Sequence, residues 1–204
     1  MSRIHSIAFV LLSPLALAAC GRGGTVAIEL TDAAPILSTL DKVEVSLSKI
    51  EVQSKYSCHG GRGDGDHEKT ASDHDKGGTW ETVNEQAGTF DLLSLQNDVT
   101  APLGEVDVWG EVNRIRMHID LAGTNQVIMS DGQVCPLDMS RVPSDGVDIS
   151  HEFEAIDVPN GGRATVVVDF DIEKSLDEMA LCSFALTPVL TIKRVEMEEE
   201  AAAE

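Results

Sequence analysis

The feature that most constrains the fold is a hydrophobic period of two, which recurs in separated stretches along the chain. Alternating apolar and polar side chains are typical of a strand with one buried face and one solvated face. We therefore expect strands over 25–30, 42–53, 111–121, 164–172 and 184–192. In the second stretch the apolar phase slips by one position between Leu47 and Ile50, which predicts a β-bulge near Ser48 and Lys49.

The same alternation assigns side chains to the core or to the solvent. The inward-facing residues of the third stretch are expected to be Ile115, Met117, Ile119 and Leu121. In the fourth stretch, Asp169 and Asp171 fall on the solvent face. Pro188 lies within the last stretch, and because proline cannot donate to a sheet ladder, that stretch is predicted to be an edge or bulged strand.

Turn signals rich in glycine separate these stretches. They include Asp131-Gly132, Pro143–Gly146 and Asn160–Gly162. Short strands divided by such turns predict an all-β sandwich. One short helix is expected around 92–98, with a further turn near 175–179.

The N-terminal residues 1–19 have the pattern of a signal peptide. Arg3 precedes an apolar run from Ile4 to Leu17, which is too short to cross a hydrocarbon layer as a helix. Leu17-Ala18-Ala19-Cys20 resembles the lipobox of bacterial lipoproteins, so we expect cleavage before Cys20 and lipidation of its thiol. Residues 20–24 would then be a short linker to the first strand. Gly21 stands where an aspartate would retain a lipoprotein at the inner membrane, and therefore favours the outer membrane.

Composition narrows the classes of partner. The chain has a formal charge of −20, and removing residues 1–19 takes away Arg3 and no acid, which gives −21. A nucleic-acid partner is disfavoured because affinity for phosphates depends on Lys and Arg. With two Trp, one Tyr and five Phe, the chain is also poorly supplied for an aromatic sugar-binding platform. Residues 25–195 suit one domain, and 196–204 form an acidic tail that we expect to be frayed.

A polar insertion over 57–78 carries the densest set of possible metal ligands. The candidates are Cys58, His59, Asp64, Asp66, His67, His74 and Asp75. Such nitrogen, sulfur and carboxylate donors suit zinc, nickel or copper, and the carboxylates suit calcium, although their spacing fits no closed motif. The alternative is a disordered insertion, because the segment offers little apolar surface to offset the entropy of ordering.

Three cysteines remain after Cys20, in a compartment where disulfides persist. We favour a bridge between Cys135 and Cys182, because both lie in or beside expected strands whereas Cys58 lies in the insertion. Two buried free thiols are the alternative. Cys58 would then be a free thiol, an intermolecular bridge or a metal ligand.

No nucleophile elbow, phosphate loop or zinc-protease helix is present in the sequence. Asp169 and Asp171, with Asp32, could form a calcium site or an acid–base pair, but solvated or turn-capping acids are the simpler interpretation. We therefore expect a protein that is not an enzyme.

Several short motifs follow one another in a recognisable order. They are Thr31-Asp32-Ala33-Ala34, Phe90-Asp91-Leu92-Leu93-Ser94-Leu95-Gln96, Leu103-Gly104, Ile115-Arg116, Val142-Pro143-Ser144, Asp169-Phe170-Asp171 with Ser175-Leu176, and Leu186-Thr187-Pro188-Val189. The ordered set, from about Thr25 to Arg194, resembles the bacterial and archaeal family named domain of unknown function 4382. The resemblance implies an exported, often lipidated, immunoglobulin-like or prealbumin-like antiparallel β-sandwich, and it implies no activity. The chain departs from the family at Val106–Gly110, which replaces the usual proline-and-glycine turn.

Two function classes follow from these patterns. The first is a non-catalytic module, anchored to a membrane through Cys20, that contacts a protein or another component of the cell envelope. The second is an envelope protein that binds a divalent metal through residues 58–75.

Overall fold

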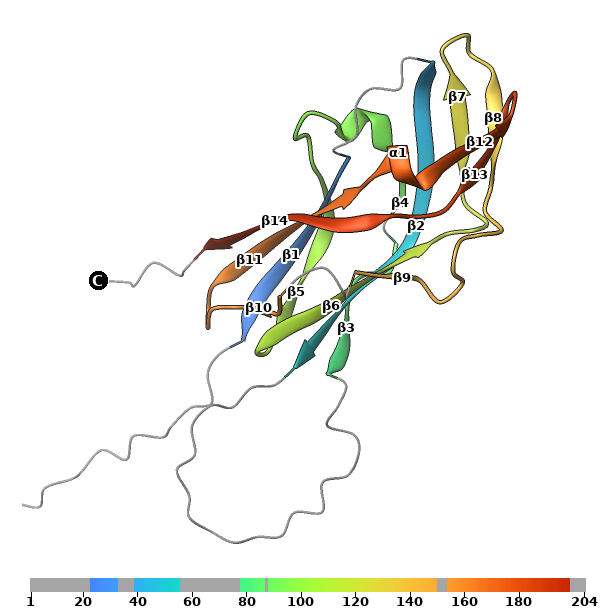
Figure 1. Cartoon of the computed structure of the whole chain (residues 1–204). Helices are drawn as coiled ribbons and strands as arrows, with labels where there is room; N and C mark the ends of the chain where they lie inside the picture. The colour runs from blue at the N-terminus through green and yellow to red at the C-terminus, as the bar shows by residue number, and fades with distance from the viewer. Residues whose placement is uncertain (1–22, 33–38, 56–77, 87, 150–153, 199–204) are drawn as a thin grey trace, which may run out of the picture.

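The computed structural model describes residues 23–32, 39–55, 78–86, 88–149 and 154–198. Within these ranges most of the chain forms strands, which assemble into two open sheets (Figure 1). The β-rich class expected from the sequence is therefore confirmed. We call the smaller sheet sheet A and the larger one sheet B.

Sheet A has four strands, in the order β14–β11–β1–β5. Their bounds are β1 (Gly24–Thr31), β5 (Ala101–Val108), β11 (Arg163–Phe170) and β14 (Leu190–Glu198). Strand β1 is antiparallel to β5 but parallel to β11, with Val26 beside Ala164 and Leu30 beside Val168. This parallel pair differs from the antiparallel pairing expected. Parallel neighbours need a long crossover, and here the chain between β1 and β11 supplies most of sheet B.

Sheet B has ten strands. Their bounds are β2 (Leu40–Lys55), β3 (Thr79–Asn84), β4 (Gly88–Asp91), β6 (Glu111–Ile119), β7 (Gln126–Met129), β8 (Val134–Asp138), β9 (Val147–Asp148), β10 (Ile156–Asp157), β12 (Leu176–Ala180) and β13 (Ser183–Leu186). The main path runs β10–β6–β2–β7–β8–β13–β12, while β3 and β4 pair with β2 and β9 pairs with β6. Strand β12 is therefore an edge strand, and the β13–β8 pair is a second parallel pair.

Strand β2 is the long central strand of sheet B. It pairs with β6 and β7 along one edge and with β3 and β4 along the other. Leu47 pairs with Ile119 whereas Lys49 pairs with His118, so Ser48 is the extra residue of the predicted bulge. Because of this bulge, the apolar residues before and after it all face the core.

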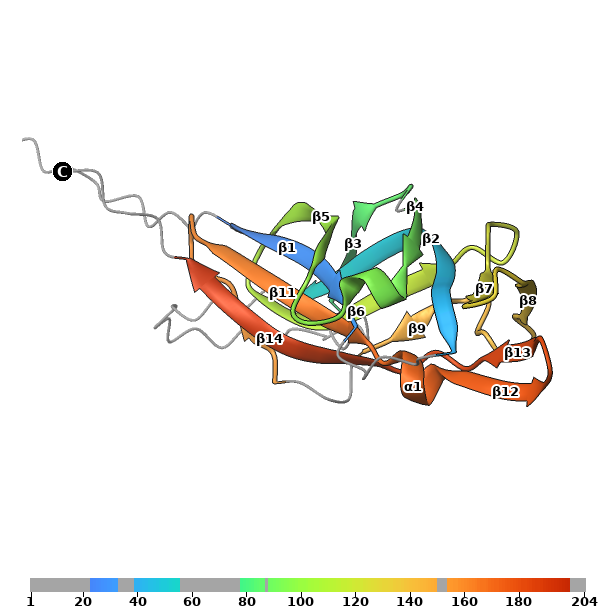
Figure 2. The same cartoon turned by 90° about the horizontal axis from the view of Figure 1, so that it is seen from above.

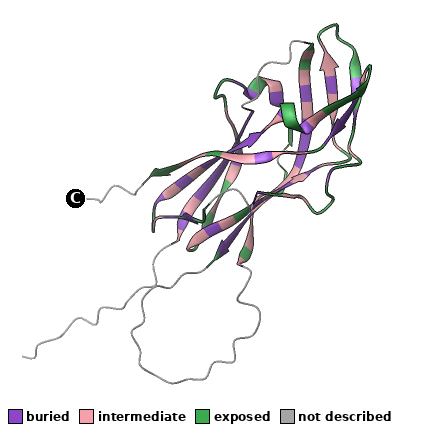
Figure 3. Cartoon of the chain, viewed as in Figure 1, coloured by how far each residue is buried: buried purple, intermediate pink, exposed green. Residues whose placement is uncertain are grey.

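The buried apolar side chains of both sheets form one continuous core. Figure 3 shows buried residues along the strands of both sheets. Sheet A contributes alternate residues of β1 and β11, among them Ile28 and Phe170. Sheet B contributes Ile50 and Ile115 from its two longest central strands. Burying one such side chain stabilises the fold by about 1.5–3 kcal/mol relative to leaving it exposed.

The helix expected around 92–98 is present as a 3-10 helix, η2, over Leu92–Leu95. A short α-helix, α1, covers Ile172–Ser175, just before the turn expected near 175–179. The residues after α1, where a turn was predicted, form strand β12.

Leu121 was expected in the core but is 50% exposed, because β6 ends at Ile119. The Asp120 carboxylate accepts a hydrogen bond from the Ala122 N–H (3.0 Å), and this local turn ends the strand.

The stretch expected as a single strand over 184–192 is two strands in different sheets. Strand β13 ends at Leu186 and β14 begins at Leu190, so Pro188 lies in the crossing between the sheets. Ser175 positions this crossing: its carbonyl accepts from the Thr187 N–H, and its hydroxyl accepts from the Val189 N–H. Strand β14 continues to Glu198, so 196–198 pair with β11 although we assigned them to the tail.

Candidate functional site

The predicted metal ligands and the lipidation site lie outside the described residues. They are Cys20, Cys58, His59, Asp64, Asp66, His67, His74 and Asp75. The structure does describe both ends of the polar insertion: Ser54 of β2 pairs with Thr79 of β3, and the Gln53 amide donates to the Gly78 carbonyl (3.2 Å). Within the described ranges, no group of three or more His, Cys, Asp or Glu side chains is placed to hold a metal ion.

The three acids Asp32, Asp169 and Asp171 are less exposed than the sequence pattern indicated. Asp32 is fully buried, and Asp169, expected on the solvent face, is only 9% exposed. Asp171 caps α1 by accepting from the Lys174 N–H (3.0 Å), and it forms an ion pair with the Lys174 ammonium. Burial raises the pKa of Asp171, but these hydrogen bonds outweigh burial and leave the pKa below its ordinary value. Asp171 therefore has the turn-capping role.

Several of the ordered motifs meet where β1 ends, and we call this cluster the motif junction. It comprises Thr31, Asp32, Gln96, Ile172 and the residues of η2 that they contact. The Thr31 hydroxyl donates to the Leu95 and Val99 carbonyls at 3.0 and 2.9 Å.

The Asp32 carboxylate accepts from the Gln96 amide (3.3 Å) and from the Ile172 N–H (3.5 Å). The motif junction therefore joins β1, η2 and α1. These hydrogen bonds have a structural role, since they satisfy buried polar groups.

A paired charged cluster covers the outer face of β2 and β6. The Glu51 carboxylate contacts Lys49 (2.5 Å) and His118 (2.8 Å). Burial raises the pKa of Glu51, but the two hydrogen bonds outweigh burial and the pKa is lowered overall. Beside it, Arg116 binds both oxygens of Asp148 (2.5 and 3.0 Å) and lowers the pKa of that carboxyl.

Arg116 also stacks over the Trp80 ring, with the guanidinium carbon 4.4 Å from the ring centroid. This stacking connects β3 to the charged cluster, and β9 is held there by the Asp148 pair.

Cys135 and Cys182 form a disulfide with a Cα–Cα distance of 5.0 Å. It joins β8 to the tight turn between β12 and β13. Around it lie large apolar side chains that are exposed: Val134 (55%), Met179 (60%) and Leu181 (85%). We call these three residues the hairpin tip.

The start of β1 is held at the opposite end of the domain. The Gly23 carbonyl accepts from the Gly161 N–H (3.1 Å), and the Thr25 N–H donates to the Gly162 carbonyl (2.9 Å). On its other side, Gly23 lies so close to the β5–β6 turn that an added Cβ would be 3.3 Å from the Trp109 ring. Trp109 is 44% exposed.

Sequence reasoning singled out neither the hairpin tip nor Trp109. In the sequence, Met179 and Leu181 look like any other apolar residues that could lie in the core. Their exposure becomes evident only once β12 is known to be an edge strand. Trp109 does lie in the segment that departs from the family pattern, and this departure was the one sequence signal that could have drawn attention to it.

Among the described residues, no helix is long and apolar enough to cross a membrane.

Two open sheets around a single core, with a hairpin fixed by a disulfide, define a β-rich domain. Residues 23–188 match the family described as Domain of unknown function (DUF4382), and the chain belongs to this family. The resemblance noted from the ordered motifs is thereby confirmed. No curated protein and no solved structure matches the chain.

Proposed function

We propose that the chain is a lipoprotein of the cell envelope, anchored through Cys20, and that its domain binds a protein partner without catalysing a reaction. We further infer that the two sheets form an immunoglobulin-like or prealbumin-like sandwich, which is supported by their single shared core. The non-catalytic role is supported by Asp171, one acid of the candidate catalytic pair, whose carboxylate is engaged in capping α1 and in an ion pair with Lys174.

The observation that carries the interaction role is the exposed apolar hairpin tip. Val134, Met179 and Leu181 each lie within three residues of a disulfide cysteine. These exposed side chains form apolar surface next to the disulfide, which fixes their position. Exposed apolar surface of this kind often marks a site of protein contact. Among the described strands, β12, which carries Met179, also ends the path of sheet B, and a partner strand could add to its outer edge.

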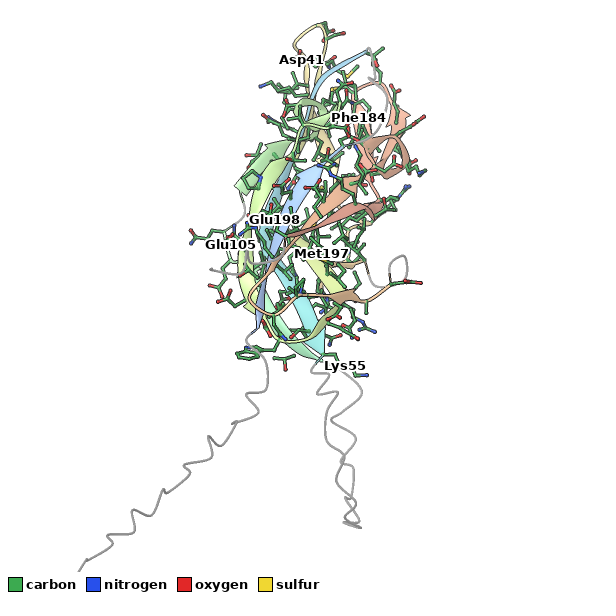
Figure 4. All side chains as sticks on the ribbon, turned by 90° about the vertical axis from the view of Figure 1, so that its left-hand side faces the viewer. Asp41, Lys55, Glu105, Phe184, Met197 and Glu198 are labelled. Carbon is green, nitrogen blue, oxygen red and sulfur yellow. A yellow bond between two sulfur atoms is a disulfide. The ribbon has the colours of Figure 1, made fainter. Side chains whose placement is uncertain are left out.

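The position of the hairpin tip suits a protein anchored at its N-terminus. Figures 1 and 2 both show the start of β1 at one end of the domain and the β12–β13 turn at the other. Figure 4 likewise places Phe184 of β13 toward one end and Lys55, at the end of β2, at the other. A lipid on Cys20 would therefore leave the hairpin tip pointing away from the membrane.

The interaction role is tested by site-specific crosslinking in living cells. A photoreactive residue at Leu181 should capture an envelope protein, and the same residue at Leu121, another exposed leucine, should not. Leu181→Asp should abolish binding of the captured protein, whereas Leu121→Asp should leave it unchanged. Capture from both positions alike, or from neither, would contradict the proposal.

The anchor is tested by palmitate labelling and membrane fractionation. The wild-type chain should incorporate label and sediment with outer membranes, for which Gly21 is the sequence support, and Cys20→Ala should lose both properties. Retained labelling in Cys20→Ala would refute lipidation at this residue.

The second candidate function is metal binding by the polar insertion. It is favoured by the donor-rich sequence over 58–75 and by the paired strands that hold both ends of the segment. Native mass spectrometry of the domain, titrated with zinc, copper or calcium, should show one bound ion. The matched control replaces 58–75 by a Gly-Ser linker, and equal uptake by both proteins would remove this candidate.

A further inference from the structure

The N-terminal end of the domain presents a tryptophan beside the point where the anchored chain enters. Strand β5 ends at Val108 and β6 begins at Glu111, so Trp109 and Gly110 alone form the turn between them. Gly110 has φ +84°, which permits this tight reversal. We call this turn the β5–β6 corner.

Gly23 is fixed against the β5–β6 corner by packing and hydrogen bonding. A Cβ on Gly23 would be 2.4 Å from the Val108 carbonyl oxygen and 3.3 Å from the Trp109 ring. On the other side the backbone of 23–25 bonds to the turn at 161–162. The entry point of the chain therefore cannot move away from Trp109 without breaking these contacts.

Chain length then limits how far Trp109 can lie from the lipid. Cys20 precedes Gly23 by three residues, which span at most about 11 Å when fully extended. The interfacial layer of a bilayer is about 5–8 Å thick on each side of the hydrocarbon core. A diacylglycerol on Cys20 would thus hold the β5–β6 corner at or next to the headgroups.

Tryptophan is suited to that position because its ring is apolar and its indole N–H is polar, and it is enriched at membrane interfaces. The net charge of the domain disfavours its electrostatic adsorption to a membrane. The mature chain has a formal charge of −21, from −20 less the charge of Arg3, so an anionic surface would repel it.

We propose that Trp109 is a second membrane contact, which inserts into the headgroup layer beside the lipid on Cys20 and fixes the orientation of the domain. The inference rests on the proposed lipidation. The partner is the bilayer interface itself, with zwitterionic headgroups favoured by the charge of the domain. With two contacts instead of one, the long axis stands away from the membrane and the hairpin tip projects outward.

The test uses the full-length lipoprotein, purified from membranes and reconstituted in vesicles of phosphatidylethanolamine and phosphatidylcholine. The chain has two tryptophans, so Trp80→Phe leaves Trp109 as the only indole reporter. Its emission should shift to shorter wavelength and should be quenched most strongly by lipids brominated near the headgroup. In the matched variant Trp109→Phe, the emission of Trp80 should be quenched much less, because Arg116 covers one face of the Trp80 ring.

The possible results separate the two claims. Mass spectrometry of the same samples reports the acyl groups on Cys20. An acylated chain whose Trp109 emission is neither shifted nor quenched overturns this inference and leaves the anchor intact. A chain without acyl groups overturns the proposed anchor and this inference together. If Trp80→Phe fails to fold by circular dichroism, the difference in quenching between wild type and Trp109→Phe gives the same comparison.

Discussion

Reduction of the Cys135–Cys182 disulfide should lower the free energy of unfolding by about 4 kcal/mol. The bridge spans a sequence separation of 47 residues, and closing a loop of that length removes about 14 cal/mol/K of entropy from the unfolded chain. Reduction breaks the S–S bond but removes neither sulfur atom. No cavity forms at Cys135, which is fully buried, and the measured loss therefore reports the crosslink.

The assay is urea unfolding of the domain without residues 1–20, with and without reductant. Cys58→Ser removes the remaining thiol that could exchange with the bridge. For a slope of about 2 kcal/mol per molar urea, the midpoint should fall by about 2 M. Because a crosslink also alters the slope, free energies extrapolated to water are compared. The additional variant Cys135→Ala with Cys182→Ser should not respond to reductant. Equal stability of the oxidised and reduced domains would refute the reasoning.

Three further predictions concern the charged cluster, the motif junction and the entry of the chain. Arg116 lowers the pKa of Asp148 below its ordinary value of 3.8, so the stabilisation from this pair is complete above that pH and is lost as pH falls through the lowered pKa. The urea midpoints of wild type and Asp148→Asn should therefore converge in acid, and a constant gap would contradict this. Asp32→Ala should lower the free energy of unfolding by about 1–3 kcal/mol, because it leaves buried donors unmet, whereas Asp157→Ala at an exposed position should change it little. Similar losses for the two variants in thermal unfolding would be evidence against the buried role. Gly24→Ala would place a Cβ 2.5 Å from the Pro159 carbonyl oxygen and should lower the free energy of unfolding by about 1–3 kcal/mol. An unchanged melting temperature would show that the start of β1 is not tightly packed.

The alternation of apolar and polar residues predicted the features that depend on a few neighbouring residues. The phase slip after Leu47 identified the bulge in β2, because apolar residues on both sides of it must reach one core. At two positions where the pattern failed, a nearby polar group had changed the chain direction. Asp120 ends β6 before Leu121, and Ser175 holds the crossing that contains Pro188.

Long-range pairing was beyond the sequence pattern. Period two tells which face a residue occupies but not what covers that face, so Asp169 was assigned to solvent although it is buried. Nothing local indicates that β1 lies parallel to β11, more than a hundred residues later in the chain. The same limit applies to the candidate site, because Leu181 and Trp109 acquire meaning only from the edge strand and the chain entry beside them.

The interior position of β1 determines how the domain bears mechanical load. A pull applied at Gly23 acts along the axis of a strand that pairs with β11 on one side and β5 on the other. The hydrogen bonds run across the strand axis, perpendicular to it in the antiparallel β1–β5 ladder and slanted in the parallel β1–β11 ladder. Such a pull therefore shears the ladders and loads many bonds at once instead of opening them one by one. An edge strand in the same place would be held by one ladder instead of two. The proposed attachment point therefore lies on a strand that two neighbouring strands must release before it can slide.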